Sequence, residues 1–167
     1  MAVKLNYISI NDLELRSGKT QDISISYQIF GRPLHTAPII LVNHALTGNS
    51  GIDQWWEPLV GSGKVLDTDK FTLLALDIPG NGFDGDVDRL IYNYQDWCLA
   101  DVGLAFVKAI QVLNIKTIDL GIGGSIGGAL LWEMIAIAPD LFKTIVPIAA
   151  DWKATDWLIA CCHVQES

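Results

Sequence analysis

The residues best suited to chemistry form a glycine-rich segment centred on one serine. Gly123, Gly124, Gly127 and Gly128 flank Ser125 in the order Gly-Gly-Ser-Ile-Gly-Gly. The spacing Gly-x-Ser-x-Gly is typical of a nucleophile elbow, a tight turn from a strand to a helix that lifts the serine hydroxyl out of the sheet. A side chain two residues before or after the serine would clash in that turn. The segment therefore predicts a serine nucleophile for acyl transfer or hydrolysis.

The residues on either side of Ser125 favour the same interpretation. The apolar run over 117–122 predicts a short strand, and the run over 126–138 predicts a helix that ends before Pro139. Two alternatives stay open: a glycine-rich turn in which Ser125 only caps the helix, and a nucleotide-binding loop. The second is weaker, because the spacing Gly-x-Gly-x-x-Gly has Ile126 in its last position and no Gly-Lys-Ser/Thr follows.

A second segment of chemical interest is residues 44–48 (HALTG), which follow a continuous apolar run. Acyl transfer passes through a tetrahedral oxyanion, which needs hydrogen-bond donors already in place. In serine hydrolases with an elbow, one donor is the backbone N–H after the nucleophile, here Ile126, and the other comes from the loop after the third strand. Leu46 is the best candidate for that second donor. We expect His44 and Gly48 to support the loop, and we do not expect His44 to be the general base.

Length and composition favour one acidic and strongly apolar domain. The 167 residues suffice for one domain that buries roughly 70% of its unfolded surface. The formal net charge of −8 argues against nucleic acid and anionic membranes as partners. Hydrophobic residues make up 50% of the chain and charged residues 18%, against roughly 25% charged residues in soluble domains. Such a chain is expected to expose apolar surface that another element or subunit covers.

No membrane span, signal peptide or metal site is expected. Asp77, Glu133 and Lys143 keep the apolar runs shorter than the roughly 18 residues of a membrane-spanning helix. The first six residues have no signal-peptide core, which predicts a cytoplasmic protein. The three cysteines weakly support that compartment, and the segment 161–163 (CCH) has no second Cys or His pair with which to hold a metal.

The order of apolar patterns predicts an α/β fold with a mostly parallel sheet and helices on both faces. Strands are predicted over 3–10, 23–30, 38–43, 71–78, 117–122 and 144–149, the first two as an antiparallel pair around a turn at 16–19. The stretch 53–69 is expected to be partly helical. A long helix is predicted over 93–113, with Asn93 as its N-cap and Asn114 as a left-handed residue at its end.

Six short segments share an order with a known family. They are 44–50 (HALTGNS), 55–56 (WW), 61–64 (GSGK), 66–69 (LDTD), 123–128 (GGSIGG) and 146–150 (VPIAA). Together they resemble the homoserine O-acetyltransferase branch of the α/β-hydrolase superfamily, over about residues 20–160. The resemblance implies that acetyl-CoA is an acyl donor rather than a bound cofactor. It also implies that Ser125 attacks the thioester, that Leu46 and Ile126 donate to the oxyanion, and that homoserine or a similar alcohol accepts the acetyl group.

Two positions depart from that family pattern. The segment 77–83 (DIPGNGF) resembles the D-x-P-G-x-G loop of esterases and lipases in the same superfamily, whereas the acetyltransferases carry a Gly-Ser-Cys-x-Gly type of loop there. Ile126 stands where the acetyltransferases favour Met. A second hypothesis is therefore an esterase that transfers the acyl group to water.

The catalytic acid and base are harder to place. In this fold they follow the serine in the order acid, then histidine, after later strands. Only His163 follows Ser125, with Asp140, Asp151 and Asp156 between them, and we do not expect these residues to complete a triad. We expect the chain to be the N-terminal portion of a longer enzyme, without the C-terminal strands and lid, in which 151–167 begins the lid or forms an unstructured tail. A third hypothesis follows, namely an inactive half-enzyme that needs a complementing C-terminal half. The alternative partner is a second copy of the chain in a homodimer.

Overall fold

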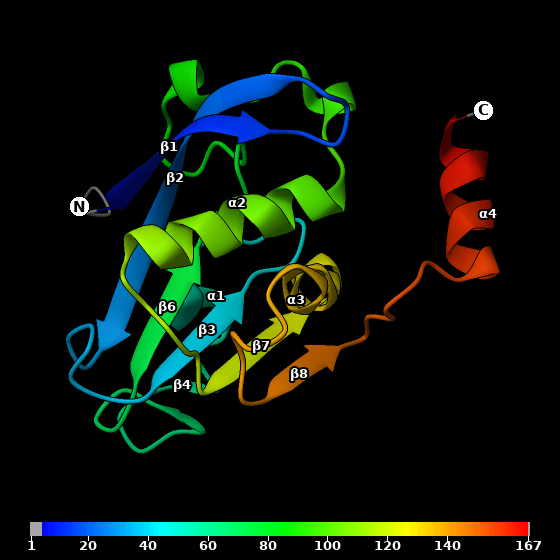
Figure 1. Cartoon of the computed structure of the whole chain (residues 1–167). Coiled ribbons are helices and arrows are strands. Elements are labelled where there is room, and N and C mark those ends of the chain that lie inside the picture. The colour runs from blue at the N-terminus through cyan, green and yellow to red at the C-terminus, as the bar shows by residue number, and fades with distance from the viewer. Residues whose placement is uncertain (1–4, 167) are drawn as a thin grey trace.

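A six-stranded sheet forms the centre of the molecule (Figure 1). The computed structural model describes residues 5–166. In sheet order the strands are β1 (Asn6–Glu14), β2 (Thr20–Gly31), β6 (Thr72–Leu76), β3 (Ile39–Asn43), β7 (Leu120–Gly124) and β8 (Ile145–Ile148). The pairs β6–β3, β3–β7 and β7–β8 are parallel, and β1–β2 and β2–β6 are antiparallel. The predicted α/β architecture with a mostly parallel sheet is confirmed.

The inner strands form where the sequence is continuously apolar. All residues of β3 and β6 are buried, because both faces of these strands are covered. The outer hairpin of β1 and β2 is longer than predicted. An irregularity between Ile10 and Leu13, with Asp12 at φ 51°, lets pairing continue to Glu14 and Thr20. Residues 3 and 4 of the first predicted strand lie outside the described residues.

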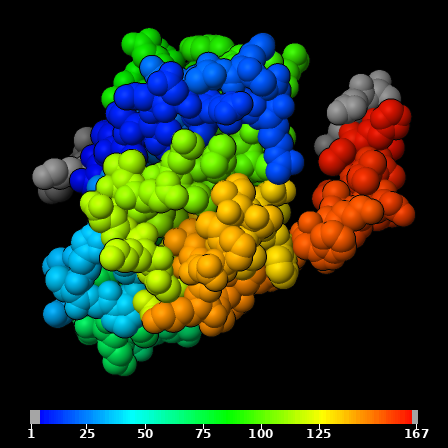
Figure 2. All heavy atoms as spheres, in the orientation of Figure 1, coloured from blue at the N-terminus to red at the C-terminus, as the bar shows by residue number. Residues whose placement is uncertain are grey.

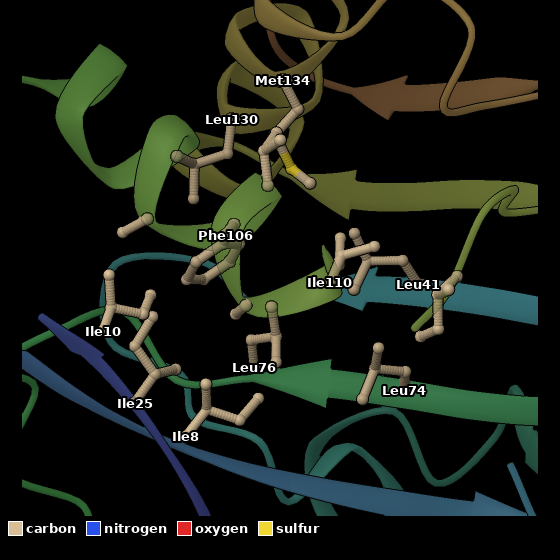
Figure 3. Close-up of a cluster of buried hydrophobic side chains, with 14 of the residues drawn as sticks. Ile8, Ile10, Ile25, Leu41, Leu74, Leu76, Phe106, Ile110, Leu130 and Met134 are labelled. Carbon is tan, nitrogen blue, oxygen red and sulfur yellow. The ribbon is translucent and has the colours of Figure 1, made fainter. Parts of the chain in front are cut away.

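Two helices, α2 (Leu99–Val112) and α3 (Ile126–Ile137), cover one face of the sheet. Figure 3 shows Phe106 and Ile110 of α2 and Leu130 and Met134 of α3 facing side chains of the strands. Burying each such side chain stabilises the fold by about 1.5–3 kcal/mol. This layer holds α3, and with it the serine at the start of α3, firmly on the sheet.

The other face has a lighter cover. It consists of the single turn α1 (Ile52–Trp55) and a ribbon of two short strands, β4 (Val60–Gly61) and β5 (Leu66–Asp67). Their buried residues Ile52, Val60 and Leu66 pack against Ile40 and Val42 and their neighbours on the sheet. The stretch predicted to be partly helical is therefore one helical turn followed by this ribbon.

The long helix predicted over 93–113 begins later than expected, at Leu99. Residues 94–96 form a separate 3-10 turn, Tyr94–Asp96, and the N-cap of α2 is Cys98 instead of Asn93. The cause is Asp101, whose carboxylate accepts the Cys98 backbone N–H at 2.8 Å in a capping box. Asn114 has φ 56° and ends the helix as predicted.

The C-terminal segment differs from the rest of the molecule. Helix α4 (Asp156–Glu166) stands apart from the sheet, joined to β8 by an extended stretch (Figures 1 and 2). Its Trp157, Leu158 and Ile159 are exposed. The segment 151–167, expected to be a lid start or an unstructured tail, is thus helical over 156–166, and residue 167 lies outside the described residues. Within residues 5–166, no helix is long and apolar enough to cross a membrane.

Candidate active site

Ser125 lies in the tight turn between β7 and α3. Its backbone has φ 55° and ψ −125°, a region that residues other than glycine rarely adopt, and strain of this kind is concentrated at functional sites. The Ser125 N–H donates to Ile148 O of β8 at 2.9 Å, and the Ser125 carbonyl accepts from the N–H groups of Gly128 and Ala129. The side chain is exposed, and in the described part of the chain nothing hydrogen-bonds to its Oγ. The turn thus presents a free hydroxyl above the sheet.

The glycines on either side of Ser125 differ in how much room they have. A Cβ on Gly123 would lie 2.5 Å from Gly127 O, and a Cβ on Gly127 would lie 2.5 Å from Asn43 O. A Cβ on Gly128 would lie 2.8 Å from Ala150 Cβ, whereas a Cβ on Gly124 would meet nothing within 4 Å. The turn therefore requires glycine at 123 and 127 and has no such requirement at 124.

The same close approach places the predicted oxyanion donors at one edge of the sheet. Because β3 and β7 are parallel with Asn43 opposite Gly123, both strands end at this edge. Ile126 is the first residue of α3, where a backbone N–H has no intrahelical acceptor. Leu46 lies in the loop after β3, and its side chain is 73% exposed. Among the described residues, neither Leu46 N–H nor Ile126 N–H donates to a protein acceptor.

His44 is fully engaged in holding that loop. The Ile78 N–H can only donate, and it reaches His44 Nε2 at 3.0 Å, which leaves the ring proton on Nδ1, 2.7 Å from Ala45 O. Burial lowers the pKa of His44 below 6.5, against smaller opposite effects of the Ala45 carbonyl and the Asp77 carboxylate. A buried neutral ring with both nitrogens paired is suited to support the loop rather than to accept a proton from Ser125. Gly48 closes the turn by donating to Ala45 O at 2.8 Å.

The other two histidines lie elsewhere. His35 precedes β3 and is therefore at the opposite edge of the sheet, and His163 is exposed on α4. Asp140, Asp151 and Asp156 are exposed as well. Within residues 5–166, the structure does not bring a histidine and a carboxylate together with Ser125. The same residues contain no group of three His, Cys, Asp or Glu side chains that could hold a metal ion.

Sequence reasoning missed two buried polar residues beneath the site. Asn43 is 1% exposed and donates through Nδ2 to Gly127 O at 3.2 Å, and its Oδ1 has no partner among the described residues. Asp77 is 2% exposed and accepts from the backbone N–H and the Oγ of Ser50. A signal existed for both, because each is the first polar residue after a continuous apolar run in the sequence.

Comparisons with known proteins agree with this geometry. The family model described as "alpha/beta hydrolase fold" matches residues 38–159. Among curated relatives, the homoserine O-acetyltransferase of Corynebacterium diphtheriae is 33% identical over 98% of this chain and 47% of its own length. The homoserine O-acetyltransferase of Trichormus variabilis is 30% identical over 89% of this chain and 44% of its own length. The chain thus spans about half the length of the curated relatives it matches.

Solved structures show the same fold at lower sequence identity. A homoserine O-acetyltransferase from Staphylococcus aureus superposes with a TM-score of 0.82 at 23% identity, over 98% of this chain and 51% of that chain. The acetyl esterase MekB also gives 0.82, at 19% identity, over 98% of this chain and 49% of that chain. Transferases and esterases therefore share this architecture, and the fold alone does not choose between them.

Proposed function

The chain belongs to the alpha/beta hydrolase fold family, and we propose that it carries the nucleophile and the oxyanion hole of a serine acyltransferase. The observation that supports this most directly is the strained turn at Ser125, with an exposed hydroxyl beside the first N–H of α3. A helix N-terminus favours negative charge, and a tetrahedral intermediate on Ser125 would develop its charge next to Ile126 N–H. The Leu46 N–H would supply the second donor.

In the proposed reaction the acyl group is transferred twice. Ser125 Oγ attacks the thioester carbonyl of acetyl-CoA, loses its proton to a base, and forms a tetrahedral oxyanion. Collapse of this intermediate breaks the C–S bond, and the thiol leaves with the proton while acetyl-Ser125 remains. The hydroxyl of homoserine or a similar alcohol then attacks the acetyl-serine carbonyl and gives its proton to the base. Collapse of this second intermediate breaks the bond between the acetyl carbon and Oγ, Oγ takes the proton back from the base, and the acetyl ester of the alcohol leaves. The 30–33% identity to two curated homoserine O-acetyltransferases supports this choice of donor and acceptor.

We infer further that the base is a histidine on a complementing polypeptide that packs beside β8, because the three histidines of this sequence lie within the described residues and none is placed to serve Ser125. His44 has both ring nitrogens paired, and β8 pairs only with β7 within residues 5–166. Val146 and Ile148 of β8 are about two-fifths exposed, which leaves an edge that a further strand would cover. A complementing C-terminal half fits that edge. Self-association through the exposed apolar surface remains a prediction, and a single monomer peak in sedimentation would contradict it.

The second candidate is an esterase that transfers the acyl group to water. The observation in its favour is the segment 77–83, which has the D-x-P-G-x-G pattern of esterases and lipases. Its Asp77 is buried and hydrogen-bonded to Ser50, at the end of the loop that carries Leu46.

The experiment measures acetyl-CoA consumption with and without homoserine, in the presence of imidazole as a soluble base. Release of CoA that depends on homoserine and on Ser125 supports the acyltransferase. Release that depends on Ser125 but is unchanged by homoserine supports the esterase. Release that is equal in the native protein and in Ser125→Ala contradicts both.

A further inference from the structure

The loop after β3 is fastened at both ends to two consecutive residues after β6. At its start, His44 Nε2 accepts the Ile78 N–H at 3.0 Å. At its end, Ser50 donates to Asp77 twice, through its backbone N–H at 2.7 Å and through its Oγ at 2.8 Å. Leu46 lies between these two attachments. The position of the loop is therefore set by Asp77 and Ile78, residues about thirty positions further along the chain.

Asp77 is an unusual attachment point because it is a buried carboxylate held by neutral donors. Besides the two bonds from Ser50, its Oδ2 accepts from Ser26 Oγ at 2.8 Å and its Oδ1 accepts from Asn81 Nδ2 at 3.0 Å. In the described part of the chain, no lysine or arginine forms an ion pair with it. Burying a carboxylate costs free energy unless hydrogen bonds satisfy its oxygens. Moving any of these donors away would leave a carboxylate oxygen unpaired, and this penalty keeps the donors in place.

A second buried aspartate provides a natural comparison. Asp67, at the end of β5, accepts the N–H groups of Gly63 and Asp69 at 3.0 Å each and pairs with Lys70 at 2.9 Å. It fastens the loop that enters β6, at the edge of the sheet opposite to Ser125. Asp67 therefore has the same structural task as Asp77, but on a loop without an oxyanion donor.

We propose that Asp77 is a positioning residue for the oxyanion hole, which sets the place of the Leu46 N–H relative to the Ile126 N–H. This inference rests on the proposed function. It assigns to the segment 77–83 a role in the acyl-transfer step that does not depend on whether water or an alcohol accepts the acyl group. The carboxylate acts through Ser50 and the loop, and it does not touch the substrate.

The test compares Asp77→Asn with Asp67→Asn in the whole chain. The first readout is hydrogen exchange of the Gly48 amide, which bonds within the loop to Ala45 O and not to Asp77 itself. Loss of a hydrogen bond to a charged group is expected to raise its exchange rate by about tenfold or more in Asp77→Asn. Asp67→Asn is expected to leave that rate unchanged, although both variants lower the free energy of unfolding.

The second readout is the rate of Ser125 acetylation by p-nitrophenyl acetate with imidazole present. A misplaced oxyanion donor lowers the maximal rate by about tenfold and leaves the ester concentration for half-maximal rate unchanged. Equal effects of the two aspartate variants on both readouts overturn the proposal, as does faster Gly48 exchange with an unchanged acetylation rate. If Asp77→Asn does not fold, Ser50→Ala removes the Oγ bond to Asp77 and keeps the backbone N–H bond, and about a threefold effect on each readout is expected.

Failure of the proposed function gives a different pattern. In that case the native protein is not acetylated at Ser125, with or without imidazole. The exchange rate of the Gly48 amide then tests the role of Asp77 separately: an unchanged rate in Asp77→Asn means that Asp77 does not hold the loop, and the inference fails as well.

Discussion

Two regions of this molecule are held in opposite ways: the elbow edge, formed by Asn43 and residues 123–128, and the C-terminal segment, residues 151–166. At the elbow, Gly127 touches the carbonyl of Asn43 so closely that a methyl group has no room. At the other extreme, Trp157 on α4 is 79% exposed and Trp152 before it is 76% exposed. One region is held by close backbone contacts between β3, β7 and α3, and the other presents large apolar side chains to solvent.

This difference matters for the proposed site, because its parts need different degrees of order. A nucleophile and oxyanion donors need fixed backbone geometry, and β3, β7 and α3 provide it through neighbouring strand ends. Proton transfer needs a histidine with a free nitrogen near Ser125. Both ring nitrogens of His44 are paired, and His163 lies on the exposed helix α4. Because the elbow edge is tightly packed and the C-terminal segment is loosely attached, substitutions in the two regions should differ in their effects on activity and stability.

The largest effect is expected at Ser125. Replacing Ser125 with Ala removes the nucleophile, and imidazole-assisted acetylation should fall at least about 10³-fold. The free energy of unfolding should change by less than about 1 kcal/mol, because the exposed Oγ has no hydrogen-bond partner in the described part of the chain. Acetylation rates and urea unfolding of the two proteins check this pair of outcomes. A variant that keeps its acetylation rate would remove Ser125 from the mechanism.

The next effect separates two glycines of the elbow. Gly127→Ala should destabilise the protein by about 3 kcal/mol, because its Cβ would lie 2.5 Å from Asn43 O. Gly124→Ala is the matched control, since its Cβ meets nothing within 4 Å, and it should change stability by less than about 1 kcal/mol. Denaturant unfolding measures both. Equal losses at the two positions would show that the elbow is not packed as described.

A pH effect is expected at His44. Its pKa is lowered from 6.5 by burial, which means that the unfolded chain takes up a proton as the pH falls below about 6.5 while the folded protein does not. The free energy of unfolding should therefore decrease below that pH, by at most about 1.4 kcal/mol per pH unit from this group. His44→Gln keeps an acceptor for the Ile78 N–H and should remove that part of the slope. His163→Gln, on the exposed α4, should leave the slope as it is, and equal slopes in all three proteins would contradict the burial of a neutral ring.

The smallest effect is expected in the C-terminal segment. Trp157→Ser on exposed α4 should change the free energy of unfolding by less than about 0.5 kcal/mol. Phe106→Ala, on the buried face of α2, should lower the free energy of unfolding by about 3–5 kcal/mol. Thermal unfolding of the two variants compares how much each region contributes to the free energy of unfolding. A large loss in Trp157→Ser would mean that α4 is packed against the body of the protein in solution.

Patterns in neighbouring residues were enough to predict the buried strands and the tight turn at Ser125. The buried strands β3 and β6 follow from continuous apolar runs, and the turn at Ser125 follows from the spacing of Gly123 and Gly127. The predicted start of α2 was wrong. Asn93 is a good N-cap in isolation, but the capping box between Cys98 and Asp101 makes the helix begin later. The ribbon of β4 and β5 was also missed, since two-residue strands have no periodicity to detect.

In the candidate site, too, local patterns predicted some residues and could not predict others. Motif spacing was enough to point to Ser125, Ile126 and Leu46, whose roles stay predictions. The pairing of His44 with Ile78 and of Ser50 with Asp77 joins residues 34 and 27 positions apart, and no local pattern carries such a contact. These attachments appear only when the ends of β3 and β6 are side by side in the sheet.

The most direct test of the central claim is peptide mass spectrometry after treatment with p-nitrophenyl acetate, with and without imidazole. One acetyl group is expected on Ser125, and it should accumulate faster with imidazole, because the elbow would supply the nucleophile and the oxyanion donors while the added base supplies proton transfer. The same treatment of Ser125→Ala serves as the control for acetylation of surface lysines. Acetyl groups spread over lysines, with Ser125 unmodified in both conditions, would contradict the account.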